Sequence, residues 1–149
     1  MDSIWDRLAE EAAAESVLWA DALLPNHERQ LVAVFSPLAP QRFALGLESI
    51  YEGYLLHYGR PRLFEPGAAD AALLLGDYLY AHGLVRIAAL GEVEAVAALA
   101  ELISACAHLR AEGHEGDGDE WVTAAGRLGG EADAEAVERA LNLHAARFG

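Results

Sequence analysis

Apolar residues recur every three or four positions along most of the chain, a spacing typical of helices that bury one face. The stretch from Asp70 to Ala89 differs, because apolar residues lie on nearly every side of it. A helix that is apolar all round is usually buried, either at the centre of a bundle or against a partner. We therefore predict that the helix at residues 70–89 is the most buried element of an all-α helical bundle.

Prolines, glycines and acidic clusters mark the ends of the other predicted helices. We expect helices from Asp2 or Ser3 to Pro25, over residues 28–36, from Pro40 to about Tyr58, from Glu92 to Gly113, from Trp121 to Gly129, and near residues 133–148. Residues 59–67 contain two prolines and two glycines and are expected to be irregular. Residues 114–120 are expected to form an acidic linker. No stretch alternates between apolar and polar residues as a strand would.

Length and composition limit the class of protein. The chain has 149 residues, of which 54% are hydrophobic, enough for the core of one helical domain spanning residues 1–149. No apolar run approaches the roughly 20 residues that a membrane-spanning helix needs. The N-terminus lacks the basic and apolar regions of a secretory signal, so we expect a cytoplasmic protein without a membrane span. Cys106 is the only cysteine, which excludes an internal disulfide and a multi-cysteine metal site.

The charge of the chain argues against nucleic acid as a partner. The formal net charge is −14, which repels nucleic acid and anionic membrane surfaces. All ten basic residues are arginines. The absence of lysine excludes a P-loop lysine, a Schiff-base lysine and a lysine general base.

Histidines and carboxylates form no recognisable catalytic or metal site in the sequence. His114, Asp117 and Glu120 of the acidic linker carry ligand-type side chains, but the register of a calcium loop is missing. The six histidines form no His-Glu-x-x-His pair, and there is no Gly-x-Ser-x-Gly elbow. We predict no catalytic residue and no metal site in this chain. Asp77 is expected to be a structural carboxylate paired with Arg86 or with a neighbouring helix end.

Residues 72–81, Ala-Leu-Leu-Leu-Gly-Asp-Tyr-Leu-Tyr-Ala, resemble the Gly-Asp-x-Leu helix of the trans-prenyl diphosphate synthases, an all-helical isoprenoid synthase family. Upstream, residues 47–57 are similar to the family helix that precedes its first aspartate-rich motif. Downstream, the segment from Ile87 to Gly113 fits the next helix of the family. The resemblance covers about residues 40–113 and implies a truncated isoprenoid-synthase-like bundle.

The first magnesium-binding motif of that family is missing. Where a catalytic member has Asp-Asp-x-x-Asp, this chain has Tyr-Gly-Arg-Pro-Arg at residues 58–62. A shifted alignment places Glu48 and Glu52 near the first and last aspartates, but it lacks the middle aspartate and the arginine pair. The sequence also ends before the position of the second aspartate-rich motif. Since ionising an allylic diphosphate requires metal ions to stabilise the departing diphosphate, we predict that this chain does not catalyse the reaction alone.

The resemblance implies a role as the short non-catalytic subunit of a heteromeric hexaprenyl or heptaprenyl diphosphate synthase. In such enzymes the catalytic subunit carries the aspartate-rich motifs and the magnesium, and this chain would bind no cofactor itself. It would replace one protomer of the family's usual dimer and help to set product chain length. We expect a hetero-oligomer, with a homodimer open for the isolated chain.

Two stripes of the helix at residues 70–89 are candidates for the subunit interface. Leu74, Tyr78, Ala81 and Val85 lie on one face, and Leu75, Leu79, His82 and Arg86 lie on the next. One stripe must face the chain's own core. We expect the other to meet the partner, together with the side of the following helix that carries Val96, Ile103 and Cys106. The predicted interface and elongation-cavity residues are Leu74, Asp77, Tyr78, Ala81, His82, Val85 and Ile103.

Two other classes of function stay open at this point. The chain could be a homo-oligomeric helical domain that binds an apolar, isoprenoid-like ligand, or an acidic regulator that acts only through protein contacts. Co-purification from the native host distinguishes the three classes. A synthase subunit brings down a chain with two aspartate-rich motifs, a lipid binder brings down its ligand, and a regulator brings down neither.

Overall fold

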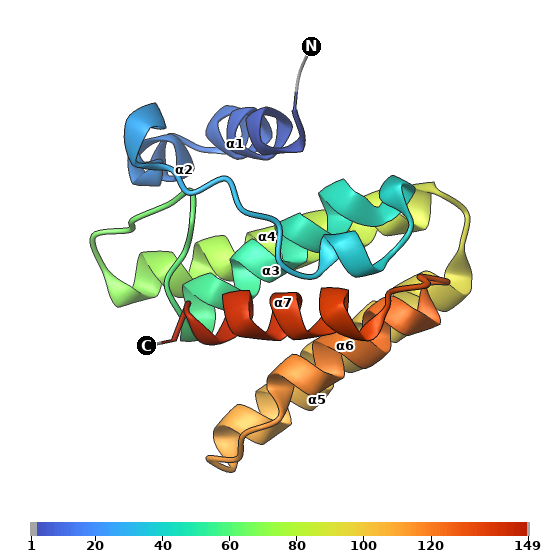
Figure 1. Cartoon of the computed structure of the whole chain (residues 1–149). Coiled ribbons are helices and arrows are strands. Elements are labelled where there is room, and N and C mark those ends of the chain that lie inside the picture. The colour runs from blue at the N-terminus through green and yellow to red at the C-terminus, as the bar shows by residue number, and fades with distance from the viewer. Residues whose placement is uncertain (1–2, 149) are drawn as a thin grey trace.

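The computed structural model describes residues 3–148, which fold into an all-α arrangement (Figure 1). The α-helices are α1 (Ile4–Glu15), α2 (Val17–Ala22), α3 (Ala44–Tyr58), α4 (Ala69–Ala89), α5 (Val93–Ala111), α6 (Asp117–Arg127) and α7 (Ala134–Ala145). Short 3-10 helices η1 (Asn26–Glu28), η2 (Ser36–Leu38) and η3 (Gln41–Phe43) precede α3. Within these residues the only strand-like pairing is one bridge between Leu23 and Phe64, so the predicted all-α class is confirmed. No helix in this part of the chain is long and apolar enough to cross a bilayer.

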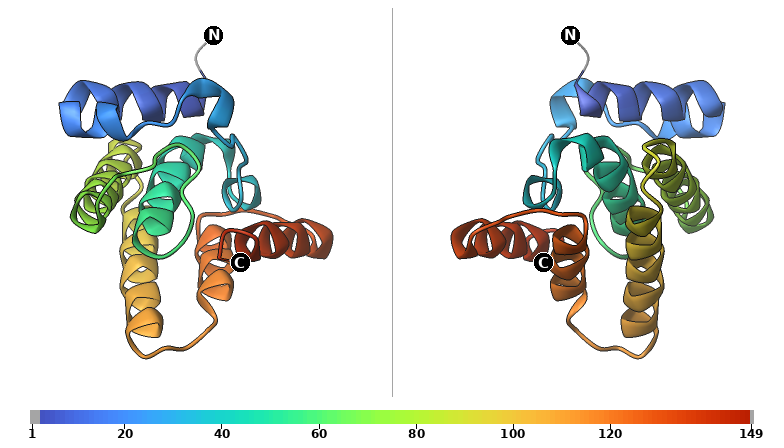
Figure 2. Two further views of the ribbon diagram at one scale, coloured as in Figure 1. Left: turned by 90° about the vertical axis from the view of Figure 1, so that its left-hand side faces the viewer. Right: turned by 90° about the vertical axis from the view of Figure 1, so that its right-hand side faces the viewer.

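The central helix is α3, and the prediction that the helix at residues 70–89 is the most buried is wrong. Twelve of the fifteen residues of α3 are buried, whereas only five of the twenty-one residues of α4 are. In both end-on views α4 lies at the outer edge of the molecule, with α3 between it and α7 (Figure 2). An all-round apolar pattern does not tell which sides of a helix its own chain will cover.

Glycines let α3 and α4 approach closely. Gly46 and Gly53 of α3 face Gly83 and Gly76 of α4 respectively, an order that makes the two helices antiparallel. A Cβ atom added at Gly53 would lie 2.7 Å from the carbonyl oxygen of Gly76, and one at Gly83 would lie 2.9 Å from that of Gly46. These distances are too short for any side chain larger than hydrogen, so the four glycines determine how tightly the helices pack.

The N-terminal helix is divided in two, in contrast to the single helix predicted up to Pro25. Ser3 caps α1 as expected, because its side chain accepts a hydrogen bond from the amide of Asp6. The alternative cap Asp2 lies outside the described residues. Ser16 then adopts an extended conformation that ends α1, and its hydroxyl accepts from the amide of Leu18 to start α2. A serine inside the apolar pattern therefore acts as the cap of a second helix.

The helix predicted at residues 28–36 is absent, whereas the irregular segment predicted at residues 59–67 is confirmed. Residues 29–35 run without helical structure alongside the second segment. The amide of Gln30 donates to the carbonyl of Arg62 at 3.0 Å, and that of Leu24 donates to Leu63 at 2.8 Å. Backbone bonding between the two segments replaces the intrahelical bonds that the apolar pattern of residues 28–36 suggested.

The C-terminal half follows the prediction with one shift. Helix α5 ends near Gly113 as predicted, and Gly91 and Gly113 both have positive φ angles at the ends of helices. Helix α6 starts at Asp117 rather than at Trp121, so the second half of the predicted linker is helical. Carboxylates in a first turn interact favourably with the helix dipole, which explains the earlier start. The last predicted helix is α7, capped by the side chain of Asp133.

Candidate functional site

One face of α4 is left open to solvent by the rest of the chain. We call Leu74, Tyr78, Ala81 and Val85, together with Ala88, the α4 face. Leu74 is 59% exposed and Val85 is 65% exposed, and the two alanines are exposed as well. Tyr78 is half-buried at the edge, where its ring lies 6.2 Å from that of Trp19. The first of the two predicted stripes is therefore the one that points outward.

The second stripe faces the chain's own core. Leu75 and Leu79 are 0% and 1% exposed and belong to a cluster with Leu8 and Phe64. At the edge of this cluster, α1 reaches α4 through Glu11, which pairs with Arg86 and lies 3.3 Å from His82 Nε2. Helix α1 therefore covers one flank of α4 and leaves the α4 face uncovered.

Asp77 and the residues named on the next helix occupy different environments. Asp77 is exposed and lies 3.1 Å from Nε2 of His57, in the last turn of α3, so of the two predicted partners Arg86 is wrong and the neighbouring helix end is correct. Ile103 is half-buried. Cys106 is 1% exposed in the main core, and this burial raises the pKa of its thiol to about 12. The prediction that Cys106 contributes to an interface is therefore wrong, because Cys106 faces the chain's own interior, whereas Val96 and Ile103 on the same side are only half-buried.

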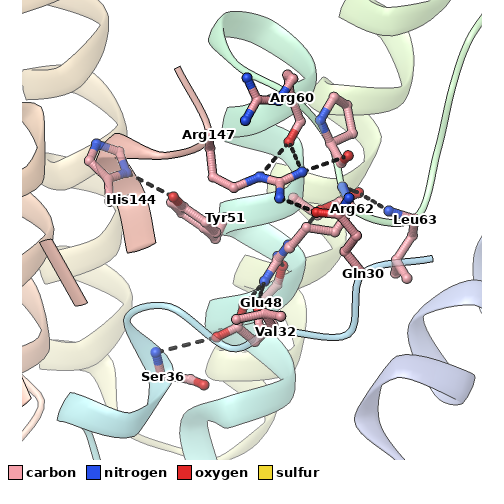
Figure 3. A network of polar contacts seen from close by, with 12 residues as sticks. Gln30, Val32, Ser36, Glu48, Tyr51, Arg60, Arg62, Leu63, His144 and Arg147 are labelled. Carbon is pink, nitrogen blue, oxygen red and sulfur yellow. Dashed lines mark hydrogen bonds and ion pairs between the residues drawn. The ribbon is translucent and has the colours of Figure 1, made fainter. Parts of the chain in front are cut away.

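A buried ionic cluster joins α3 to the irregular segment that follows it, as Figure 3 shows. The side chains of Glu48, Glu52 and Arg62 are all almost completely buried. Arg62 Nη1 lies 2.6 Å from Glu48 Oε1, and Arg62 Nε lies 2.9 Å from Glu52 Oε1. Burial opposes the charge of Arg62, but the two carboxylates outweigh it and raise the pKa of the guanidinium.

Every oxygen of the two carboxylates accepts a hydrogen bond. Glu52 Oε2 accepts the amides of Arg62 and Leu63 at 2.8 Å each, and Glu48 Oε2 accepts the amide of Ser36 at 3.3 Å. Two aromatic rings, those of Trp5 and Tyr51, flank the guanidinium at 4.9 and 5.0 Å. The cluster is therefore closed and saturated, which is the condition under which buried charges are tolerated.

The sequence pattern did not predict this cluster. Glu48 and Glu52 stand four residues apart in an otherwise apolar helix, which is a signal for buried charge that needs a partner. Their partner Arg62 comes from the irregular segment at residues 59–67, and nothing in the sequence pattern indicates that this segment folds back onto α3. Residues 3–148 contain no group of three or more His, Cys, Asp or Glu side chains arranged to hold a metal ion.

A second polar network lies at the start of α6. Arg110 Nη2 lies 2.5 Å from Asp117 Oδ2, and the hydroxyl of Tyr54 also donates to Asp117. His144 Nδ1 shares a hydrogen bond of 2.7 Å with the hydroxyl of Tyr51, and burial raises the pKa of that hydroxyl, so it keeps its proton. These contacts tie α5, α6 and α7 to α3. A cleft of about 400 Å³ opens beside them, and none of the described residues that line it is a Ser, Thr, Cys or Lys.

Comparison of the chain with protein-family models, with curated proteins and with solved structures found no match. The α4 face and the closed Glu48–Arg62–Glu52 cluster are therefore the two features of the molecule that bear on its function.

Proposed function

We propose that this chain is a non-catalytic subunit of a heteromeric medium- or long-chain prenyl diphosphate synthase. In this proposal it packs on a catalytic subunit through the α4 face and helps to set the length of the product. The catalytic subunit supplies the aspartate-rich motifs and the magnesium. The resemblance of residues 40–113 to the synthase family supports the choice of partner, and the structure supports the choice of surface.

The observation that carries the proposal is the exposure of the α4 face. Leu74 and Val85 are each more than half exposed on the helix that carries the family-like Gly-Asp-x-Leu segment. Leu73, next to Leu74, is 50% exposed, and Val93, the first residue of α5, is 81% exposed. Large apolar side chains that are exposed along one face of a helix, as Leu74 and Val85 are, are typical of a face that meets another protein. The family's own dimer uses the corresponding helix, which makes a catalytic subunit the partner we favour.

The state of Glu48 and Glu52 supports the non-catalytic part of the proposal. These are the residues that the shifted alignment puts near the first and last aspartates of the metal-binding motif. Their charges are compensated by Arg62, and their side chains are sealed from solvent. A carboxylate already bound to a guanidinium and to backbone amides offers poor ligands to magnesium, which prefers open, hydrated oxygen sites. Metal-assisted ionisation of a diphosphate would have to occur on the partner.

The test is to express the tagged chain in its native host and to identify what co-purifies. The proposal predicts a chain with two aspartate-rich motifs, and it predicts that the complex makes prenyl diphosphates while this chain alone makes none. Ala81→Glu and Tyr78→Glu should dissociate the pair, because burying an unpaired charge in an interface costs about 2–5 kcal/mol. Ala134→Glu is the matched control, since it adds the same charge at an exposed position on α7.

Two results would refute the proposal. One is robust condensation of isopentenyl diphosphate by the single chain after contaminating synthases are removed. The other is an Ala81→Glu variant that folds, still binds the catalytic chain and leaves product length unchanged. If the wild-type chain instead forms a dimer with itself through the α4 face and no second chain co-purifies, the homo-oligomeric alternative replaces this one.

A further inference from the structure

Three arginines converge on one cleft. The cleft has a volume of about 260 Å³ and lies between α1, the start of α3 and the C-terminal end of α4. Arg7 comes from α1, Arg42 from η3 and Arg86 from the last turn of α4. The other residues that line it are glycine or apolar, and no carboxylate is among them.

This concentration of positive charge is unusual for the chain. The sequence has 24 Asp and Glu residues against 10 arginines, so an average surface cleft should contain more acidic than basic groups. Four other clefts in residues 3–148 each include at least one Asp or Glu. The side chains that line the arginine cleft are therefore cationic, and after pairing with Glu11 and Glu92 the three arginines retain one positive charge that would attract an anion locally.

The two carboxylates that pair with these arginines do not neutralise all three guanidinium groups. Glu92 forms a bidentate pair with Arg42, with both distances at 2.8 Å. Glu11 serves the other two arginines, pairing with Arg86 and lying 4.0 Å from Arg7. The pKa of Arg86 is lowered because burial removes water from its guanidinium and because Arg7 adds a like charge. Within residues 3–148, the buried Nε–H of Arg86 has no acceptor.

We propose that this cleft binds a small soluble phosphate monoester. Its phosphate lies among the guanidinium groups of Arg7, Arg42 and Arg86, and its apolar body lies against Leu45 and Leu90. A phosphate carries close to two negative charges and three acceptor oxygens, which suits several planar donors better than a carboxylate does. A lipid headgroup is disfavoured as the source of the phosphate, because the net charge of −14 repels anionic bilayers. The inference does not depend on the proposed synthase partner.

The experiment is isothermal titration of the isolated chain with phenyl phosphate and with inorganic phosphate, at pH 7.5 and constant ionic strength. We expect saturable binding at one site, with phenyl phosphate the tighter ligand because its ring meets the apolar walls. Arg7→Gln and Arg86→Gln should each weaken binding at least about tenfold, the cost of one charge-assisted hydrogen bond. Arg139→Gln on α7 lies outside the cleft and should bind like the wild type.

No saturable binding, or equal binding by all three variants, would overturn the proposal. So would a sodium chloride titration that reproduces the phosphate signal. Arg7→Gln decides the outcome if Arg86→Gln fails to fold, because Arg7 is half-exposed and, among the described residues, its one ion pair is the 4.0 Å contact with Glu11. Circular dichroism of each variant verifies the fold before titration.

Discussion

Helices α3 and α4 have similarly continuous apolar sequences but opposite environments. Helix α3 lies between α4 on one side and η2, α6 and α7 on the other, and it is buried along almost its whole length. Helix α4 has its own chain on one side only, and its other side carries exposed Leu74 and Val85. A helix with apolar residues on every side is stable in water when other elements pack against all of its faces. The rest of this chain packs against α3 on nearly all sides but leaves one face of α4 exposed.

The charges on the two helices differ in the same way. Glu48 and Glu52 of α3 lie in the interior and are compensated by Arg62. Asp77 of α4 is exposed at the rim and lies against His57, whereas Arg86 is largely buried and pairs with Glu11. Buried charges that are fully bonded are costly to break, whereas rim pairs contribute little. Substitutions on α3 and its partners should therefore have larger effects than substitutions on the outer side of α4.

The largest effect is expected from Arg62→Met, which leaves Glu48 and Glu52 buried without a cation. Removing one partner of a buried ionic cluster costs about 3–5 kcal/mol, so the variant should be close to unfolded at neutral pH. The measurement is urea unfolding followed by circular dichroism. A triple variant that also carries Glu48→Gln and Glu52→Gln should recover part of the loss, because it buries no charge. A single variant as stable as the wild type would show that the cluster is not needed for the core.

A smaller but still large effect separates the two sides of α4. Leu79→Ala removes a fully buried side chain and should cost about 2–5 kcal/mol in the free energy of unfolding. Val85→Ala, on the α4 face, should change the free energy by less than about 0.5 kcal/mol in the isolated chain. Equal losses in the two variants would mean that Val85 is covered in the isolated chain and that the comparison between α3 and α4 is mistaken.

The close packing of the two helices can be tested with one methyl group. Gly53→Ala places a Cβ atom against the carbonyl of Gly76 and should cost roughly 1–3 kcal/mol, because the helices must move apart. Gly126→Ala is the matched control, since Gly126 is also helical, but a Cβ atom added there would meet no atom within 4 Å beyond its own helical neighbours. It should stabilise the chain by about 0.5–1 kcal/mol through lower backbone entropy. Thermal unfolding of both variants gives the comparison, and a neutral or stabilising Gly53→Ala would contradict it.

The smallest effect is expected at the rim of α4. Asp77→Asn removes the charge of an exposed carboxylate that lies 3.1 Å from His57 Nε2, and it should change stability by no more than about 0.5 kcal/mol. Thermal unfolding under the conditions used for Gly53→Ala measures the difference directly. A loss as large as that of Gly53→Ala would place Asp77 among the structural charges of the core.

The fold could be predicted from the sequence where local signals decide it. The ends of α4 and α5 follow from Gly91 and Gly113, and the irregular segment follows from its prolines and glycines. The break at Ser16 and the missing helix at residues 28–36 could not be predicted in this way. In both places a hydrogen bond favours a structure that the apolar pattern does not predict. The side chain of Ser16 caps α2, and the amide of Gln30 bonds to the segment after α3 instead of to a helical neighbour.

The candidate site could be predicted only in part, because its burial and its ion pairs depend on contacts between segments that are distant in the sequence. Helical periodicity separates Leu74 and Val85 from Leu75 and Leu79, but the choice of which stripe is buried depends on where α1 and α3 lie. The Glu48–Arg62–Glu52 cluster depends on a long-range contact, so no spacing rule indicates it. Pairing across a loop is set by tertiary packing and is visible only in three dimensions.

The central claim is that the α4 face is covered by a catalytic synthase subunit, and site-directed cysteine labelling tests it most directly. Burial raises the pKa of Cys106 to about 12, so at pH 7.5 it stays a protonated, shielded thiol and gives little background. In the isolated chain, cysteines introduced by Val85→Cys and Ala134→Cys should both react rapidly with a maleimide. Adding the co-purified catalytic subunit should protect the cysteine at position 85 and leave the one at position 134 reactive. Unchanged labelling at position 85 in a complex that has formed would contradict the account.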